Sequence, residues 1–342
     1  MHLITGGSGF VGSAIARRLI ERGEKVRVLD VWRAADLPSG AEFVLGDVTN
    51  AADVAEAVKG VKYVHHNAAL VPLTKAGTRY REVNVTGTRI VLEAAKKEGV
   101  RFFAHMSSSA VFGCPDEMPI TNATPREPIE IYGHSKKIGE DIVLEEMEKG
   151  ELPISIIRPR TIIGTGRLGI FQILFDWIRD GANIYTIGKG EGLFQFVHID
   201  DLSDTSILSC LKEKPGVYNV GTDDYGTLKG DLTELCNHAG TGSRVKSLPQ
   251  SLTIGTLKAL DHMGLSPLSP WHYLTYHKPF YFDSSPVYEA LDWKPKYSNR
   301  EMMLTSYDWF VKNYDSLAVD SDGSSHKKPV KQKVLRILKS LS

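Results

Sequence analysis

A glycine-rich stretch near the N-terminus limits the possible folds of this chain more than any other feature. It lies between a predicted strand, 3–5, and a predicted helix, 13–21, and has the pattern GxxGxxG. Glycines at this spacing allow a tight turn and a close approach of the backbone to a pyrophosphate, which the free N–H groups of the helix N-terminus then face. The stretch therefore predicts a dinucleotide-binding unit. Its predicted cofactor contacts are Gly6, Gly9, Phe10, Val11 and Gly12.

Short apolar strands alternate with helical stretches through the first half of the chain. Further strands are predicted at 26–30, 43–45, 63–66, 102–107 and 154–157, and further helices at 51–58, 80–97 and 131–148. Strands that alternate with helices of this length form a parallel sheet covered on both faces. The sequence therefore predicts an α/β fold, a doubly wound Rossmann sheet.

The composition changes after about Gly164, where Gly, Pro and aromatic residues become more frequent. We expect residues 1–165 to form the dinucleotide-binding Rossmann domain and residues 166–315 to form mainly a smaller, mixed substrate-binding lobe. Some of the later segments are expected to return to the first domain. Residues 316–342 read as a flexible linker followed by a basic amphipathic tail.

An acidic residue, Asp30, ends the second predicted strand, 18 positions beyond the last glycine of the loop. A carboxylate at this place accepts hydrogen bonds from the adenosine ribose and repels a 2′-phosphate, so it favours NAD(H) over NADP(H). Arg33 lies close enough in the sequence to keep NADP(H) possible.

Tyr132 and Lys136 are four residues apart near the start of a predicted helix, so both side chains lie on one helical face. A neighbouring ammonium favours the phenolate of a tyrosine, whose ordinary pKa is about 10. Tyr132 could then exchange a proton with a substrate alcohol or ketone while hydride moves to or from a nicotinamide. A serine-rich turn, 107–109, ends a strand upstream and could polarise the same substrate oxygen.

The sequence resembles the extended short-chain dehydrogenase/reductase family, also called the NAD-dependent epimerase/dehydratase family. The matching segments keep the order of that family and span residues 1 to about 315. They are TGGSGFVG (5–12), GDV (46–48), NAA (67–69), NVTGT (84–88), SSSAVFG (107–113), YGHSK (132–136), RP (158–159) and FVHIDDL (196–202).

This resemblance implies roles for several residues around the cofactor. Asp47 and Val48 would flank the adenine, and Ala68 and Ala69 would line the cofactor behind the pyrophosphate. The remaining implied cofactor residues are Asn84, at a position that holds the local conformation, Ser107, Pro159 under the carboxamide, and the pair Tyr132 and Lys136.

The resemblance also implies the catalytic set. Ser108 would be the catalytic serine, because it stands five residues before Gly113, and Ser109 is its main competitor. Tyr132 would be the acid/base, and Lys136 would assist it and hold the nicotinamide ribose. The chain departs from the family at Phe112, where a tyrosine is usual, and this leaves the core chemistry intact.

The substrate is less constrained by the sequence. Nucleotide-sugar epimerases of this family usually carry an arginine where Phe194 stands here, and a phenylalanine cannot neutralise a diphosphate. Arg160 or Arg167 could supply that charge instead. The segment 157–164 and the aromatic cluster 271–282 resemble the 3β-hydroxysteroid dehydrogenase branch. Aromatic residues in that cluster suit an apolar substrate, or they form the core of the smaller lobe.

Three functional hypotheses follow. The first is an oxidoreductase that interconverts a secondary alcohol and a ketone on a lipid-like substrate of sterol, hopanoid or keto-sphingolipid type, with Ser109, Arg160 and Phe194 near that substrate. The second is a nucleotide-sugar 4-epimerase or dehydratase, and the third is a non-catalytic NAD sensor. An intact Ser108, Tyr132 and Lys136 set argues against the sensor, because sensing needs no proton relay. The family resemblance favours a homodimer.

The net charge and the cysteine spacing argue against a nucleic-acid-binding protein and against a metal site. Lys plus Arg equals Asp plus Glu at 41 each, so net charge predicts no nucleic-acid partner. The three cysteines are far apart and have no metal-binding spacing, so no metal site is expected. Neither a signal segment nor an apolar run of membrane-spanning length is found, so a cytoplasmic location is expected.

The tail, 327–342, has six basic residues interleaved with apolar residues at helical spacing. A basic amphipathic helix of this kind is typical of contact with a membrane surface, and each basic residue contributes about 1 kcal/mol at an anionic surface. A helix that docks on the enzyme or its partner, or a tail without structure, would have the same pattern. We predict that deleting residues 327–342 abolishes co-sedimentation with anionic vesicles, and equal binding by both forms would contradict membrane contact.

Overall fold

The computed structural model describes residues 1–74, 76–166, 169–263, 266 and 270–317. Its centre is a seven-stranded sheet in which every described neighbouring pair is parallel. The strands, in spatial order, are β10 (Gly216–Val220), β6 (Ile154–Pro159), β5 (Phe102–Met106), β4 (Tyr63–His66), β1 (His2–Thr5), β2 (Val26–Asp30) and β3 (Ala41–Leu45). The predicted Rossmann fold is thereby confirmed.

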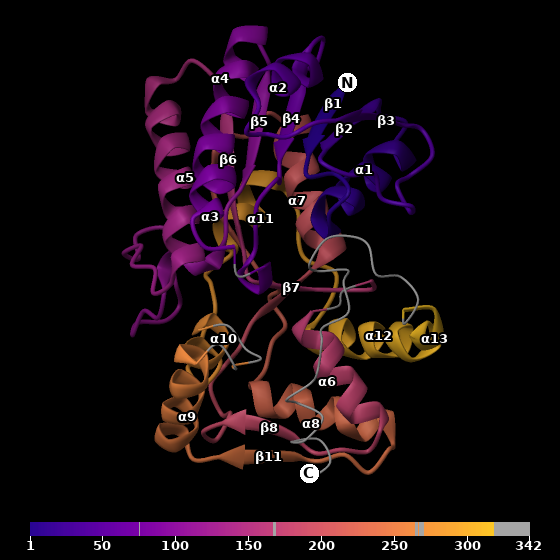
Figure 1. The fold of residues 1–342 in the computed structure, drawn as a ribbon, viewed down its shortest axis with the longest axis vertical. Helices are drawn as coiled ribbons and strands as arrows, with labels where there is room; N and C mark the ends of the chain where they lie inside the picture. The colour runs from indigo at the N-terminus through magenta and orange to yellow at the C-terminus, as the bar shows by residue number, and fades with distance from the viewer. Residues whose placement is uncertain (75, 167–168, 264–265, 267–269, 318–342) are drawn as a thin grey trace.

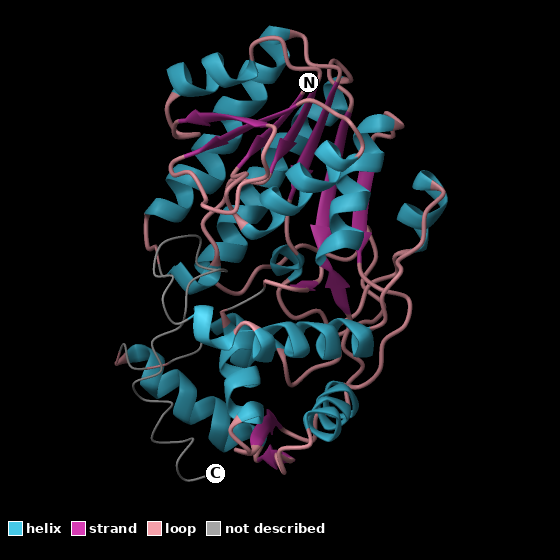
Figure 2. Cartoon of the chain, turned by 90° about the vertical axis from the view of Figure 1, so that its right-hand side faces the viewer, coloured by secondary structure: helices cyan, strands magenta, loops and turns pink. Residues whose placement is uncertain are grey.

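Helices cover both faces of this sheet, as the pattern of near-continuous apolar strands requires. One face is covered by α2 (Ala51–Val58), α4 (Thr88–Glu98) and α5 (Ile131–Lys149), and the other by α1 (Phe10–Glu21), α7 (Ile199–Leu211) and α11 (Ser285–Leu291). Buried aliphatic side chains fill both layers. Figure 2 shows the strands between these helices.

A smaller, mainly helical part lies beyond the carboxyl ends of the strands, in the lower half of Figure 1. It contains α6 (Ile170–Arg179), α8 (Leu228–Ala239), α9 (Gln250–His262), α10 (Pro270–Thr275), α12 (Asn299–Lys312), α13 (Tyr314–Leu317) and the parallel pair β8 (Ile184–Ile187) and β11 (Val245–Leu248). A second short pair, β7 (Thr161–Ile163) and β9 (Phe196–His198), lies between the two parts. None of the described helices is long and apolar enough to span a bilayer.

Two segments differ from the sequence prediction. The helix predicted over 80–97 is interrupted: α3 (Arg79–Arg81) leads into a π-helical turn, Glu82–Gly87, before α4 begins. Such wide turns often accompany functional sites, because they redirect side chains. The edge strand β10 was not among the predicted strands, and it pairs with β6 after more than fifty intervening residues.

The order of strands reverses between β1 and β4, and this is where an open parallel sheet forms its ligand crevice. The glycine-rich loop after β1 and the segment after β4 meet there without intervening side chains. A Cβ on Gly6, whose φ is 67°, would lie 2.8 Å from Ala68 Cα. A Cβ on Gly12 would lie 2.3 Å from the Gly6 carbonyl oxygen. Only glycine fits at either position.

We predict that Gly12→Ala lowers the free energy of unfolding by about 1–3 kcal/mol, because the added methyl group must displace backbone atoms of the loop. Chemical denaturation would measure the change. Gly255→Ala is the matched control, since Gly255 lies inside α9 with no atom within 4 Å of the added Cβ. That control should be neutral or stabilising by about 0.5–1 kcal/mol. Equal effects of the two substitutions would contradict the close contact at Gly12.

Candidate active site

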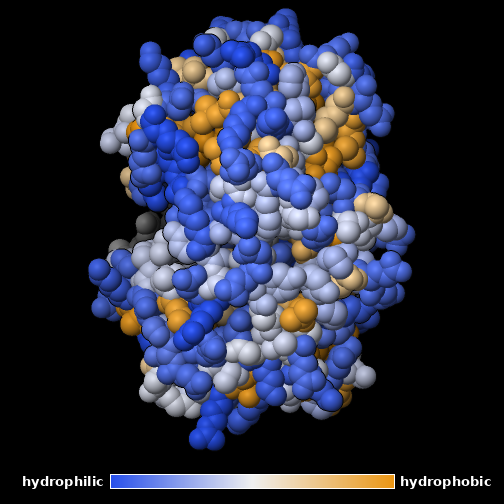
Figure 3. Space-filling view, turned by 180° about the vertical axis from the view of Figure 1, so that it is seen from behind, coloured by the Kyte–Doolittle hydropathy of each residue, from blue (hydrophilic) through white to orange (hydrophobic). Residues whose placement is uncertain are grey.

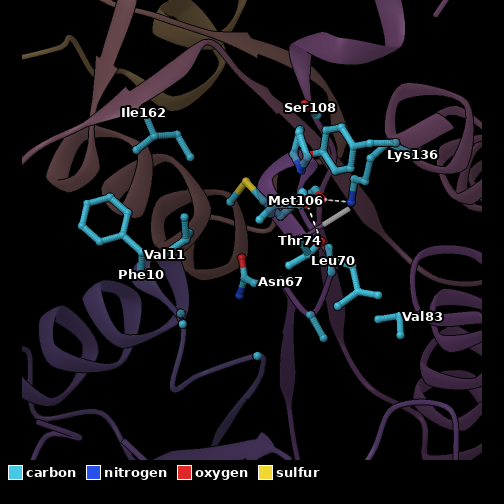
Figure 4. Close-up of a pocket in the computed structure, with 18 of the residues that line it drawn as sticks. Phe10, Val11, Asn67, Leu70, Thr74, Val83, Met106, Ser108, Lys136 and Ile162 are labelled. Atoms are coloured by element: carbon cyan, nitrogen blue, oxygen red, sulfur yellow. Dashed lines mark hydrogen bonds between the residues drawn. The ribbon is translucent and has the colours of Figure 1, made fainter. Parts of the chain in front are cut away.

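One cavity of about 430 Å³ opens at the carboxyl ends of β1, β2, β4 and β5 and extends to the helical part. Most of the residues singled out from the sequence line it. These are Gly6, Gly9, Phe10, Val11, Gly12, Asp30, Asp47, Val48, Ala68, Ala69, Ser107, Ser108, Ser109, Tyr132, Lys136, Pro159 and Arg160. Figure 4 shows Phe10 and Val11 on one side of the cavity and Lys136 on the other.

Asp30 lies at the end of β2 with its carboxylate at the cavity wall. Its Oδ2 accepts a hydrogen bond of 3.0 Å from the backbone N–H of Ser8, inside the glycine-rich loop, and burial raises the pKa of the carboxyl group. Arg33 is exposed, and its guanidinium lies 5.6 Å from the centre of the Phe43 ring. A carboxylate at the wall and an arginine outside it fit the ribose of NAD better than a 2′-phosphate.

The loop and its surroundings fit a dinucleotide. No side chain separates Gly6 from Ala68, and the first turn of α1 has no side-chain cap at Gly9. The start of α1 lines the cavity, and a helix N-terminus attracts anionic oxygens. The residues that would hold the pyrophosphate are Gly9, Phe10 and Val11.

Tyr132 and Lys136 lie in the first two turns of α5, and both line the cavity. Glu130 caps this helix by accepting hydrogen bonds from the N–H groups of Tyr132 (2.9 Å) and Gly133 (2.7 Å). The Tyr132 side chain is only 8% exposed. Capping and burial thus hold the phenol in one orientation at the end of the cavity.

Lys136 is anchored to the neighbouring strand. Its Nζ donates a hydrogen bond of 2.7 Å to the carbonyl oxygen of Met106, the last residue of β5 (Figure 4). Burial lowers the pKa of the ammonium to about 8, although the carboxylate of Glu140 acts in the opposite direction. A buried positive charge of this kind favours a negative charge on a neighbouring oxygen.

The three serines after β5 have different surroundings. Ser107 donates a hydrogen bond to the buried carboxylate of Glu140, and the Ser109 hydroxyl accepts one of 3.3 Å from Arg160. The Ser108 Oγ accepts the N–H of Ala110 at 3.2 Å. Its own hydrogen has no acceptor among the described residues, so Ser108 can donate it to a substrate oxygen.

Asn84 does not line the cavity but lies behind its wall, in the π-helical turn. Its amide accepts from the N–H of Leu70 (2.8 Å) and donates to the Leu70 carbonyl (3.1 Å) and to the hydroxyl of Ser135 (2.9 Å). Leu70 belongs to the cavity wall and Ser135 to α5. Asn84 therefore joins these two elements.

Phe194 is also absent from the cavity wall. It is 1% exposed and packs against Phe196, Tyr276 and their neighbours in the core of the smaller part. Arg160, in contrast, lines the cavity, and its guanidinium lies 4.9 Å from the Phe194 ring. Arg167 and the predicted tail fall outside the described residues. Ser316 and Leu317, the start of the predicted linker, belong to α13.

Two kinds of residue were missed by the sequence reasoning. Glu140 is fully buried and accepts hydrogen bonds from Arg126, Arg158 and Ser107. Its position, one helical turn after Lys136, could have indicated that it faces the same wall. The other cavity residues come from distant segments, and no local pattern marks them. They include Leu70 and Ile170. Trp271, His272 and Tyr276 also line the cavity, and they belong to the aromatic cluster 271–282 that the sequence had linked to the substrate.

Known proteins are similar to this chain over most of its length. The protein y4nG of Sinorhizobium fredii is 40% identical over 336 residues, 98% of this chain and 85% of that protein. UDP-arabinose 4-epimerase 1 of Arabidopsis thaliana is 28% identical over 351 residues, 90% and 78% of the two chains. The decarboxylating sterol-4-alpha-carboxylate 3-dehydrogenase of Mus musculus is 33% identical over 210 residues, 60% and 58% of the two chains.

The fold is also found in a solved structure, UDP-glucose 4-epimerase of Thermotoga maritima with UDP-glucose. The TM-score is 0.77 at 23% identity, with 92% of this chain and 99% of that chain covered. Residues 2–221, more than half of the chain, match the NAD dependent epimerase/dehydratase family. Membership of this family also confirms NAD(H) as the predicted cofactor. On these grounds the chain belongs to the NAD-dependent epimerase/dehydratase family of enzymes.

Proposed function

We propose that this enzyme interconverts a secondary alcohol and its ketone, with Tyr132 as the proton donor and acceptor. The observation that carries the proposal is the anchored ammonium of Lys136, which lines one cavity together with Tyr132, Ser108 and the glycine-rich loop. NAD, when bound, supplies the hydride acceptor and donor. Tyr132 takes the alcohol proton during oxidation and returns it during reduction.

The neighbouring residues assist this proton transfer. The Lys136 charge stabilises the phenolate of Tyr132, because both residues are buried and solvent screens their interaction less than at the surface. The Ser108 hydroxyl donates to the same substrate oxygen and keeps it in reach of the phenol. Glu140 lies behind Lys136 and is itself paired with Arg158 at 2.6 Å, which limits its competition for the ammonium.

Two substrate classes remain, a lipid-like alcohol and a nucleotide sugar, and we favour the nucleotide sugar. The enzyme would oxidise one carbon of the sugar and then reduce it again, so that the net reaction is an epimerisation. The similarity to UDP-arabinose 4-epimerase extends over 90% of this chain, whereas that to the sterol dehydrogenase extends over 60%. The aromatic cluster supports a lipid less than the sequence suggested, because Tyr273, Phe280 and Phe282 are buried in a core. Trp271 and Tyr276 do reach the cavity, and they support the lipid-like alternative.

Substrate profiling with the absorbance of NADH as readout tests this function. With UDP-arabinose or UDP-glucose we expect a C4-epimeric product without accumulation of NADH. A hydroxysterol that is oxidised with stoichiometric NADH would instead support the lipid-like alternative. Tyr132→Phe should lower turnover about 10²–10⁴-fold. The control is Tyr185→Phe on β8, outside the cavity wall, which should keep full activity. Full activity of Tyr132→Phe would refute the mechanism.

The lowered pKa of Lys136 predicts a pH dependence. Below about pH 8 the ammonium is charged and stabilises the phenolate, and above it the charge is lost. We therefore expect kcat/KM to fall as the pH rises through about 8. Lys136→Arg keeps its charge over this range and should remove that decline, even where its maximal rate is lower. An unchanged alkaline decline in this variant would assign the titration to another group.

The predicted homodimer has one supporting observation. Ile131 and Ile138 of α5 lie one above the other at i, i+7 spacing and are 55% and 41% exposed. Seen from behind, hydrophobic residues gather over the upper part of the molecule, which contains the sheet (Figure 3). We propose that α5 contributes to a dimer contact, which a monomeric mass in solution would contradict.

Contact of residues 327–342 with a membrane stays a prediction.

A further inference from the structure

Arg160 is a buried cation that the proposed proton transfer does not use. It directly follows β6, is 1% exposed, and lines the same cavity as Ser108 and Tyr132. Its guanidinium is surrounded by aromatic rings, whose centres lie at 4.0, 4.9 and 5.7 Å. These belong to Phe280, Phe194 and Phe282, respectively.

The hydrogen-bonding capacity of this guanidinium is mostly unused. Nη1 donates to the Ser109 hydroxyl at 3.3 Å, whereas Nε and Nη2 are buried and have no partner among the described residues. No carboxylate in the described part of the chain forms an ion pair with Arg160. Burial lowers its pKa to about 9, so the group remains charged at neutral pH.

Arg158 shows what a satisfied buried arginine looks like two residues earlier in the chain. Its guanidinium is equally buried, but it forms hydrogen bonds of 2.6 and 3.1 Å to the carboxylate of Glu140. Arg160 has the faces of three rings in place of a carboxylate. These rings attract a cation but accept no in-plane N–H hydrogen bond, so its Nε and Nη2 donors stay unpaired.

A buried charge with unpaired donors is unfavourable for stability, and a well-packed apolar side chain of similar size is often more stable at such a position. A ligand that brings two anionic oxygens would satisfy the guanidinium, whose planar fork matches a carboxylate or phosphate group. Such a ligand would reach Arg160 from the cavity, which this residue lines. The reacting alcohol would lie close by, because Ser109 directly follows Ser108.

We propose that Arg160 binds an anionic group of the substrate inside the cavity that also holds the reacting carbon. This inference rests on the proposed function, since it places the anion relative to Ser108. It restricts the substrate to molecules that carry a phosphate or carboxylate group able to enter this cavity together with the reacting hydroxyl. A neutral sterol would leave the guanidinium buried and unpaired.

Binding measurements on the full chain, saturated with NAD, test this proposal. The probes are UDP, and UDP-glucuronic acid compared with UDP-glucose, by titration calorimetry. For Arg160→Met we expect the Kd of a probe to rise about 10- to 100-fold. Loss of UDP binding would identify the phosphate as the anion. Loss of only the preference for UDP-glucuronic acid would identify the carboxylate. Arg160→Lys should be intermediate, because it keeps the charge without the fork.

The melting temperature separates binding from a structural role. Arg160→Met should keep or raise the melting temperature and keep NAD affinity, because it removes an unpaired buried charge. Arg300→Met is the control, an exposed arginine paired with Glu234, and should leave probe binding unchanged. Unaltered probe binding by Arg160→Met overturns the proposal. A lower melting temperature of Arg160→Met together with an equal loss of NAD binding would also overturn it. The same holds if the wild type binds none of the probes.

Failure of this proposal can be distinguished from failure of the proposed function. The titrations need no turnover, so full activity of Tyr132→Phe would refute the proton-transfer role and leave the Arg160 result to stand alone. In reverse, loss of turnover in Tyr132→Phe together with unaltered probe binding in Arg160→Met would refute only the anion site.

Discussion

The hydrogen bond from the Lys136 ammonium to the Met106 carbonyl oxygen is the contact on which the active-site geometry depends. It joins the first turns of α5 to the end of β5, which are thirty residues apart, and so brings Tyr132 and the serine turn to one cavity. The Met106 carbonyl oxygen and the carboxylate of Glu140 favour the charge in the interior, and burial still lowers the pKa of Lys136 to about 8. A group whose pKa lies near neutral pH can respond to a proton transfer beside it.

Two buried arginines near this contact have opposite surroundings. Arg158 is neutralised by Glu140, and this pair connects β6 with α5 behind the cavity. Arg160 lies among phenylalanine rings and faces the cavity, with two N–H donors unpaired among the described residues. Pairing one arginine within the protein stabilises the scaffold, whereas the other retains capacity to bind. The difference agrees with the general tendency of functional sites to keep groups that are unfavourable for stability.

Much of the sheet could be predicted from the sequence because local patterns encode it. Six apolar runs, the glycine-rich loop and Asp30 were assigned correctly to strands and turns. The interruption at Glu82–Gly87 was not predictable, because its residues have ordinary helical periodicity and the π-helical turn depends on contacts of Asn84 with Leu70 and Ser135. The strand β10 was missed because five residues on a sheet edge have little periodicity of their own.

The sequence by itself determined the Rossmann fold, the NAD loop and the spacing of Tyr132 and Lys136, because close packing and short-range spacing restrict those residue types. The choice of Ser108 as the candidate serine came from the resemblance to a known family. Only the tertiary structure decided which aromatic residues form the core and which reach the cavity, since segments far apart in the chain meet there. It also decided the setting of Arg160. A sequence cannot show that a guanidinium is buried against Phe194, Phe280 and Phe282 without a carboxylate, because that depends on which side chains pack around it.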